Sequence, residues 1–301
     1  MTPRAVQRGA MLRMTAGAAT ISTTSIFVRW AHVAPTVSAF YRMLFGGLML
    51  VGLLVVRRQW RMYSAADTFW LLLPALAFCV DLMLWHRSIR AIGPGLATLA
   101  GNFQVFIMAI AGVLFFHERL PLRFLLGVAL AVFGLWLLVG AGWGSFTPQF
   151  RLGFYFGLLT GVAYAVYMLS LRQTQLHRPH LDPMRVLCLN SLICAAMLAL
   201  AVALEGESFA IPDGQSWAAL LGLGLFGQVV GWVLIARAMP QLPPSLVGLL
   251  LLLQPALSFI LDVILFNRWT TQQDWIGLAL SLVGIFVGST RPRPPPAAEP
   301  A

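Results

Sequence analysis

Long apolar runs recur along the chain, and short polar segments rich in Arg, Pro or acidic residues separate them. An α-helix that crosses a bilayer core of about 30 Å needs roughly 20 mostly apolar residues. The pattern therefore predicts an all-α integral membrane protein with ten transmembrane helices. They are Met14–Trp30, Val37–Val56, Phe69–Trp85, Gly95–Phe116, Phe124–Ala141, Gly153–Leu171, Met184–Leu204, Trp217–Ala236, Ser245–Phe266 and Trp275–Ser289.

The composition also indicates lipid rather than water as the main solvent. Hydrophobic residues make up 59% of the 301 residues and charged residues only 10%, whereas about a quarter of a soluble chain is charged. All 20 basic residues are Arg and the net charge is +10, which cytoplasmic loops explain better than nucleic-acid binding does. Cys79, Cys188 and Cys194 lie within apolar runs without CxxC spacing, so we expect core packing and no metal site.

The arginines are unevenly distributed between the two sides. If the N-terminus lies inside, most of them, Arg268 included, are assigned to inner segments. The outer segments then hold Arg29, Arg87, Arg90, Arg151 and Arg237. The positive-inside rule therefore predicts two cytoplasmic termini in a bacterial inner membrane, with 1–13 as a cytoplasmic N-terminal segment and 291–301 as a Pro-rich disordered tail. The first run is expected to be a retained helix, because no small-residue cleavage site follows it.

The second half of the chain repeats the first. A shift of 150 residues aligns Arg87 with Arg237, Pro94 with Pro244, Gln104 with Gln254, Gly127 with Gly277 and Gly134 with Gly284. The repeats are predicted to be 14–150 and 151–290. Because each holds five crossings, an odd number, the second copy is expected to enter the membrane from the opposite side. Inverted repeats of this kind are typical of secondary transporters, which alternate access to a site near the midplane.

Several short motifs resemble those of the drug/metabolite transporter superfamily, whose members have two EamA-type repeats of five helices. They are Phe40-Tyr41-Arg42, Phe116-His117-Glu118-Arg119-Leu120, and Gly127 with Gly134. Within the superfamily the chain is most similar to bacterial exporters of aromatic and other amino acids. It departs from the pattern in the second repeat, where Asn267-Arg268-Trp269 replaces the acidic turn.

Polar residues at helical spacing predict a central binding cavity, since such groups are costly in lipid unless they face protein or water. The candidate cavity residues are Ser22, Thr98, Asn102, Thr160, Tyr164, Tyr167, Gln228, Trp232, Gln254 and Ser258. Pro255 removes a helical hydrogen bond beside Gln254 and is a candidate hinge. Ordinary packing of the bundle is the alternative interpretation of each residue.

Charged residues inside the runs are few and therefore informative. Arg42 is expected to attract a substrate carboxylate, to pair with a carboxylate or to reach the outer interface. Asp81, four residues before Trp85, is expected to bind an ammonium group, carry a coupling proton or serve as a structural acid. Asp262 is a second coupling candidate, expected near the cytoplasmic end. His86 is expected to be exposed at a loop.

These features predict a secondary transporter that functions as a monomer and exports aromatic and other neutral amino acids and related metabolites. A proton-coupled exporter of cationic drugs is the main alternative, because such a protein needs a buried carboxylate. A membrane-embedded enzyme is a further alternative of another class, but we expect no enzymatic activity, no cofactor and no nucleic-acid partner.

Overall fold

The computed structural model describes the chain except for 1–2, 117–121, 141, 239–240, 243–249 and 290–301. Every regular element in the described part is helical, so the all-α prediction is confirmed there. The α-helices are α1 (Pro3–Ser22), α2 (Thr24–Trp30), α3 (Pro35–Val56), α4 (Ala65–Ile92), α5 (Pro94–Gly101), α6 (Gln104–Phe116), α7 (Leu122–Leu135), α8 (Pro148–His177), α9 (Pro183–Leu204), α10 (Gly214–Gly222), α11 (Gly231–Ala238), α13 (Leu253–Phe266) and α14 (Gln272–Ser289). Two π-helices, Trp136–Gly140 and Leu223–Val230, and a 3₁₀ turn at Trp143–Ser145 complete the described elements.

Within the described residues, six helical segments are long and apolar enough to cross a membrane. They are Pro35–Val56, Ala65–Ile92, Leu122–Gly140, Pro148–His177, Pro183–Leu204 and Gly214–Ile235. The first predicted run is divided between α1 and α2, and the fourth between α5 and α6. Helix α1 also begins at Pro3, so the helix extends through most of the segment expected to precede the first crossing.

Local sequence explains where several helices begin. Pro35, Pro94, Pro148 and Pro183 each occupy a first helical position, where the missing N–H removes no helical hydrogen bond and the fixed φ suits the helix. The turn between α4 and α5 contains Gly93 at φ +87°, a left-handed conformation that glycine adopts without steric cost.

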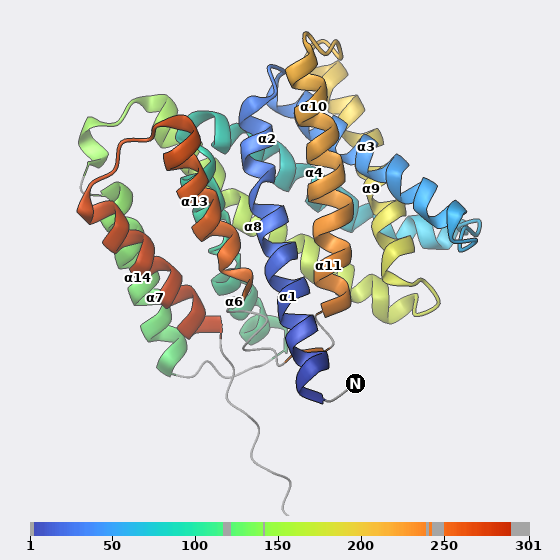
Figure 1. Ribbon diagram of the computed structural model, residues 1–301, viewed down its shortest axis with the longest axis horizontal. Coiled ribbons are helices and arrows are strands. Elements are labelled where there is room, and N and C mark those ends of the chain that lie inside the picture. Colours follow the sequence, from blue (N-terminus) through green and yellow to red (C-terminus); the bar gives the residue numbers. More distant parts are fainter. Residues whose placement is uncertain (1–2, 117–121, 141, 239–240, 243–249, 290–301) are drawn as a thin grey trace, which may run out of the picture.

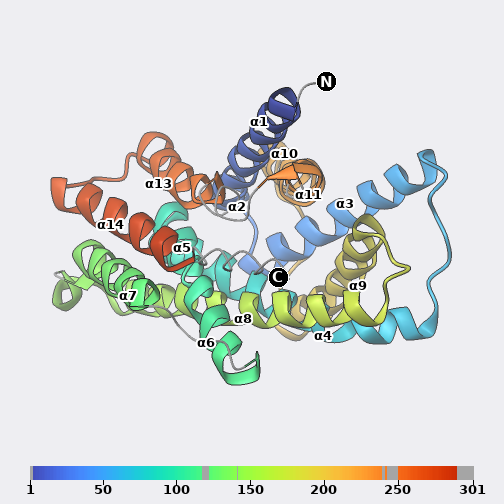
Figure 2. The ribbon, with the colours of Figure 1, turned by 90° about the horizontal axis from the view of Figure 1, so that it is seen from below.

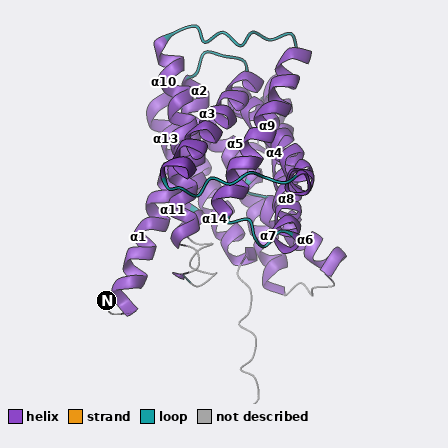
Figure 3. Cartoon of the chain, turned by 90° about the vertical axis from the view of Figure 1, so that its right-hand side faces the viewer, coloured by secondary structure: helices purple, strands orange, loops and turns teal. Residues whose placement is uncertain are grey.

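The two ends of the bundle can be defined by the residues that meet there. At the proximal end, where α1 begins, Arg13 donates to Gln241 Oε1 at 3.1 Å. At the distal end, the α2–α3 loop meets the start of α10 and the α4–α5 turn meets the end of α13. Figure 1 shows the N-terminus at the bottom and the loops of the distal end at the top, and Figure 3 shows the same arrangement from the side.

Helices from the two halves of the chain pack against each other throughout the bundle. Helix α3 lies along α9, α4 along α8, α7 along α14, and α1 along α11. Viewed from the proximal end, α3, α4 and α9 lie on one side and α7, α13 and α14 on the other (Figure 2). The pairing of α7 with α14 brings backbone against backbone, because a Cβ added to Gly134 would lie 2.5 Å from the Gly277 oxygen.

The structure corrects the positions assigned to two arginines. Arg268 lies at the distal end, where its guanidinium donates to the Ile92 oxygen at 3.3 Å. Arg237 lies at the proximal end, where its carbonyl accepts from Gln241, the partner of Arg13. The two arginines therefore exchange sides, which leaves the excess of Arg that the sequence assigns to the inner segments unchanged. Of the residues in the sequence motifs, 117–120 and Pro244 lie outside the described residues, as does the predicted tail 291–301.

Candidate functional site

A cavity of about 240 Å³ lies among α1, α2, α3, α4, α5, α6, α8, α11 and α13. Both halves of the chain therefore contribute to its wall. Most of the predicted site residues line it, namely Ser22, Arg42, Asp81, Trp85, Thr98, Asn102, Thr160, Tyr164, Trp232, Gln254 and Ser258. Pockets for drug-sized ligands occupy about 300–1,000 Å³, so this volume suits a smaller metabolite.

Arg42 and Asp81 are the two charged side chains in the lining. Each is only 5% exposed, yet none of the ion pairs described in the structure includes either of them. The Asp81 side chain forms no hydrogen bond with a described residue, and outside its own helix the backbone carbonyl accepts from Thr160 Oγ1 at 3.5 Å. The Arg42 Nε has no hydrogen-bond partner. A buried cation and a buried anion thus face one cavity with their polar atoms free to receive a ligand.

Trp85 supports the Arg42 side chain. The guanidinium carbon lies 5.4 Å from the centre of the Trp85 ring, within the range of a cation–π contact. This contact partly offsets the cost of burying the charge and leaves the N–H groups available to an anionic group. Trp232, from α11, and Tyr164, from α8, add aromatic surface to the same cavity.

The small polar side chains of the cavity mostly bond within the bundle. Thr98 Oγ1 donates to the Pro94 oxygen and Ser258 Oγ to the Ser22 oxygen, at 2.8 and 3.0 Å. Asn102 Nδ2 donates to the Thr98 oxygen at 2.8 Å. These groups keep the wall polar but have part of their hydrogen-bonding capacity occupied.

Three residues lie elsewhere than the sequence analysis placed them. Tyr167 is not in the lining and stacks on Phe78 at 4.5 Å. Gln228 is also absent from it and donates to Ser191 Oγ at 3.0 Å, because α9 packs close to the π-helix. The expectation of an exposed His86 is wrong, since this residue is fully buried and its Nδ1 lies 2.5 Å from Ser38 Oγ.

The two proposed conformational residues of α13 also lie outside the lining. Asp262 accepts from the Gly95 backbone N–H and pairs with Arg268, both at 3.2 Å. It therefore braces the distal end, opposite the start of α1, whereas the sequence analysis expected it on the same side as the N-terminus, and its carboxylate is occupied by protein groups. Pro255 is buried in the first turn of α13, just after an interruption at Leu252, where a proline is readily accommodated.

Gln104, which the sequence analysis used only to align the repeats, lines the cavity as its counterpart Gln254 does. Neither side-chain amide forms a hydrogen bond with a described residue. Identity at a shift of 150 residues, combined with the polar character of the side chain, was the available signal for Gln104. Among the described residues, no group of three or more His, Cys, Asp or Glu side chains could hold a metal ion.

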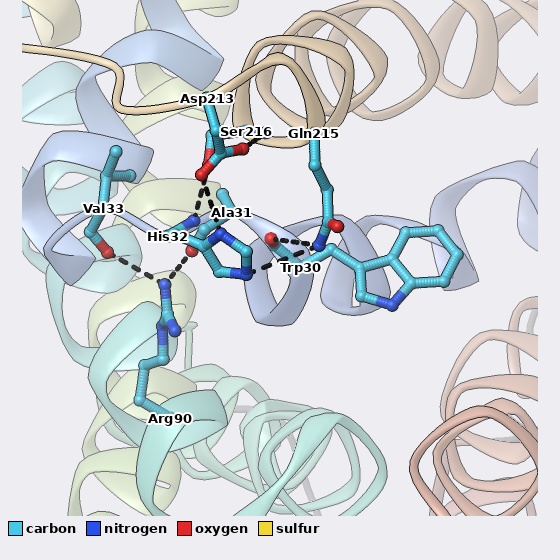
Figure 4. A network of polar contacts seen from close by, with 8 residues as sticks. All are labelled: Trp30, Ala31, His32, Val33, Arg90, Asp213, Gln215 and Ser216. Carbon is cyan, nitrogen blue, oxygen red and sulfur yellow. Dashed lines mark hydrogen bonds and ion pairs between the residues drawn. The ribbon is translucent and has the colours of Figure 1, made fainter.

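Polar contacts join the two halves at the distal surface above the cavity (Figure 4). His32 Nδ1 lies 2.8 Å from Asp213 Oδ2, and the His32 backbone N–H donates to Ser216 Oγ at 2.8 Å. Arg90 donates to the carbonyls of Ala31 and Val33. The Ser216 backbone N–H, together with the His32 side chain, holds the pKa of Asp213 below its usual range.

The comparisons with known proteins identify a transporter family. The model of the EamA-like transporter family matches residues 8–140 and again 151–290. An uncharacterized transporter of Bacillus subtilis (strain 168), YetK, is 24% identical over 200 residues, which cover 64% of this chain and 60% of the relative. The matched region thus spans less than two thirds of that relative. A solved structure described as "Crystal structure of protein" shares the fold, with a TM-score of 0.66, 19% identity, and coverage of 94% of this chain and 98% of the other.

Proposed function

Because this chain belongs to the EamA-like transporter family, we propose that it exports neutral amino acids and related small zwitterions. The observation that carries the proposal is the pair of buried, opposite charges in the cavity, neither of which is in a described ion pair. The N–H groups of Arg42 match a carboxylate and the carboxylate of Asp81 matches an ammonium group. One charge of each sign suits a zwitterion better than a dianion, which would need several basic groups.

The proposed mechanism is alternating access by two inverted repeats, and the packing of the helices supports it. Helix α4 packs on α8 as its counterpart α11 packs on α1. Gly127 lies against Gly284, and their counterparts Gly277 and Gly134 lie against each other. Such reciprocal contacts are expected of a pseudo-twofold axis in the membrane plane, through which the halves can exchange conformations.

One hydrogen bond indicates where that axis would pass. Ser281 Oγ donates to the backbone oxygen of Ala131, which is 150 residues earlier, at 3.3 Å. Ala131 is therefore the counterpart of Ser281 in the first repeat. A contact between counterparts is possible only close to a twofold axis, so the pseudo-twofold axis is proposed to pass between α7 and α14.

The proposed setting is a bacterial inner membrane, with the proximal end and both termini in the cytoplasm. The excess of Arg at the proximal end supports this orientation. The contacts of Asp262 and the network around His32 then lie on the outer side.

The test is uptake of labelled amino acids by inside-out vesicles, with and without a proton gradient. We expect the wild-type protein to accumulate neutral amino acids, and Asp81→Asn and Arg42→Gln each to raise the half-saturation concentration by about ten- to a hundredfold, since a hydrogen bond to a charged group contributes about 1.5–3 kcal/mol. Gln173→Ala, at an exposed glutamine outside the lining, is the control. Unchanged uptake by both charge variants would remove the proposal.

A proton-coupled exporter of cationic drugs is the second candidate, and the observation that favours it is the single carboxylate in the lining, Asp81. The two candidates differ in what Arg42 does. A cationic substrate gains from the loss of Arg42, whereas a zwitterion loses its carboxylate partner. Transport of a labelled organic cation that is faster in Arg42→Gln than in wild type would favour the drug exporter.

A further inference from the structure

Two membrane helices are interrupted at positions that correspond in the two repeats. In the first repeat α5 ends at Gly101 and α6 begins at Gln104, with a turn at Asn102 and Phe103. In the second repeat a turn at Leu252 precedes α13. Since Leu252 is 150 residues after Asn102, the interruptions are counterparts under the shift that aligns the repeats.

Different residues produce the two interruptions. Asn102 donates its side-chain amide to the Thr98 oxygen, and the backbone there changes to i→i+3 hydrogen bonds such as Phe103 N–H to the Ala100 oxygen at 3.2 Å. In the second repeat Pro255 has no N–H to offer to the carbonyl of Leu251. Different residues thus interrupt the helix at corresponding positions in the two repeats. This indicates that the interruption itself contributes to function.

The glutamine that follows each interruption lines the cavity. Gln104 is the first residue of α6 and Gln254 the second of α13. Both are in the lining, and neither amide forms a hydrogen bond with a described residue. Helix α8 approaches the first interruption closely, since a Cβ at Gly161 would lie 3.1 Å from both the Gln104 nitrogen and the Gly101 oxygen, which leaves little room for the Gln104 backbone to withdraw.

The charged residues of the cavity, in contrast, have no counterparts. The residue 150 positions after Arg42 is Leu192, and the one after Asp81 is Gly231. When inverted repeats exchange conformations, each element takes up the place its counterpart held in the other state. The two glutamines therefore exchange places with no net change in the wall, whereas Arg42 and Asp81 move relative to the cavity and nothing replaces them.

We propose that Gln104 and Gln254 are substrate-contacting residues that hold the polar part of the substrate equally in both access states, while Arg42 and Asp81 make the affinities of the two states differ. This rests on the proposed function. An amide can donate to a carboxylate and accept from an ammonium group, so one glutamine suits either end of a zwitterion. The glutamine pair keeps a bound substrate in place during the transition, and the charges set the direction in which release is easier.

The experiment compares the two faces of the membrane, with labelled phenylalanine as the probe. Half-saturation concentrations are measured for the full chain in inside-out and in right-side-out vesicles. Gln104→Met and Gln254→Met keep the length of the side chain but remove the amide. We expect each to raise the half-saturation concentration about three- to tenfold, as expected for one neutral hydrogen bond, and by similar factors at both faces. Arg42→Gln is expected to raise it by clearly unequal factors.

The outcomes separate this proposal from the one it rests on. If the wild-type protein moves phenylalanine and either Met variant equals wild type at both faces, the glutamine pair is refuted and the proposed function stands. If the Met variants act at one face only, the equal role in both states is refuted. If the wild-type protein moves no labelled amino acid at either face, the proposed function is refuted, and the proposed role of Gln104 and Gln254 is refuted with it. Gln173→Met, at an exposed site outside the lining, controls for the substitution, and detergent-extracted yield controls for folding.

Discussion

The brace at Asp262 is expected to hold the distal end closed. Asp262 is 3% exposed and accepts from the Gly95 backbone N–H at 3.2 Å. Its ion-pair partner Arg268 donates to the Ile92 oxygen at 3.3 Å. Both bonds to the α4–α5 turn connect the second half of the chain to the first, and both must break if the halves separate at this end.

The magnitude follows from these contacts. A hydrogen bond to a charged group contributes about 1.5–3 kcal/mol, and Asp262→Ala removes the acceptor of the Gly95 bond and the ion-pair partner of Arg268. The Arg268 side chain is 20% exposed, so water can solvate its charge after the ion pair is removed. We therefore take the lower half of the range of about 1.5–3 kcal/mol. Since about 1.4 kcal/mol changes an equilibrium tenfold, the population with an open distal end is expected to rise about tenfold to fortyfold.

Cysteine accessibility measures that population. Thr98→Cys places a thiol in the cavity lining, and its rate of modification by a membrane-impermeant maleimide is recorded in intact cells with and without Asp262→Ala. Wild-type Cys79, Cys188 and Cys194 are buried and give the background rate. Asp274→Ala is the matched control, because Asp274 bonds only to Thr271 of its own turn. An equal modification rate in the two aspartate variants would refute the role of the brace.

Two further predictions concern stability. Gly134→Leu is expected to destabilise the pairing of α7 with α14 by about 1–3 kcal/mol, because its Cβ would lie 2.5 Å from the Gly277 oxygen; a detergent thermal melt should show a lower midpoint, while Gly144→Leu, in open space, should not. The lowered pKa of Asp213 means that its stabilising effect is complete above the ordinary carboxyl pKa and is lost as the pH falls through the lowered one, below about pH 4. Thermal midpoints should therefore fall less steeply in acid for Asp213→Asn than for wild type, and Glu207→Gln, at an exposed carboxylate, should behave as wild type; equal slopes in all three would contradict the linkage.

The helical period allowed part of the site to be predicted from sequence. Residues three or four positions apart share a face, which is why Gln254 and Ser258 on one helix, and Asp81 and Trp85 on another, reach the same cavity. The period fixes which residues of a single helix are neighbours, but not which other helix their face meets. Tyr167 was therefore predicted to line the cavity, whereas its ring stacks on Phe78 of another helix.

The sequence by itself determined that the chain is a helical membrane protein and that its two halves correspond. The length of the apolar runs, the distribution of Arg and the 150-residue match are properties of the chain alone. The tertiary structure decided which polar groups are free. His86 is buried against Ser38 and Asp262 is occupied by Gly95 and Arg268, whereas Arg42 and Asp81 are in none of the described ion pairs and the Arg42 Nε has no hydrogen-bond partner. The reason is physical: whether a buried polar group is satisfied depends on atoms contributed by helices far apart in sequence, and only their packing brings those atoms together.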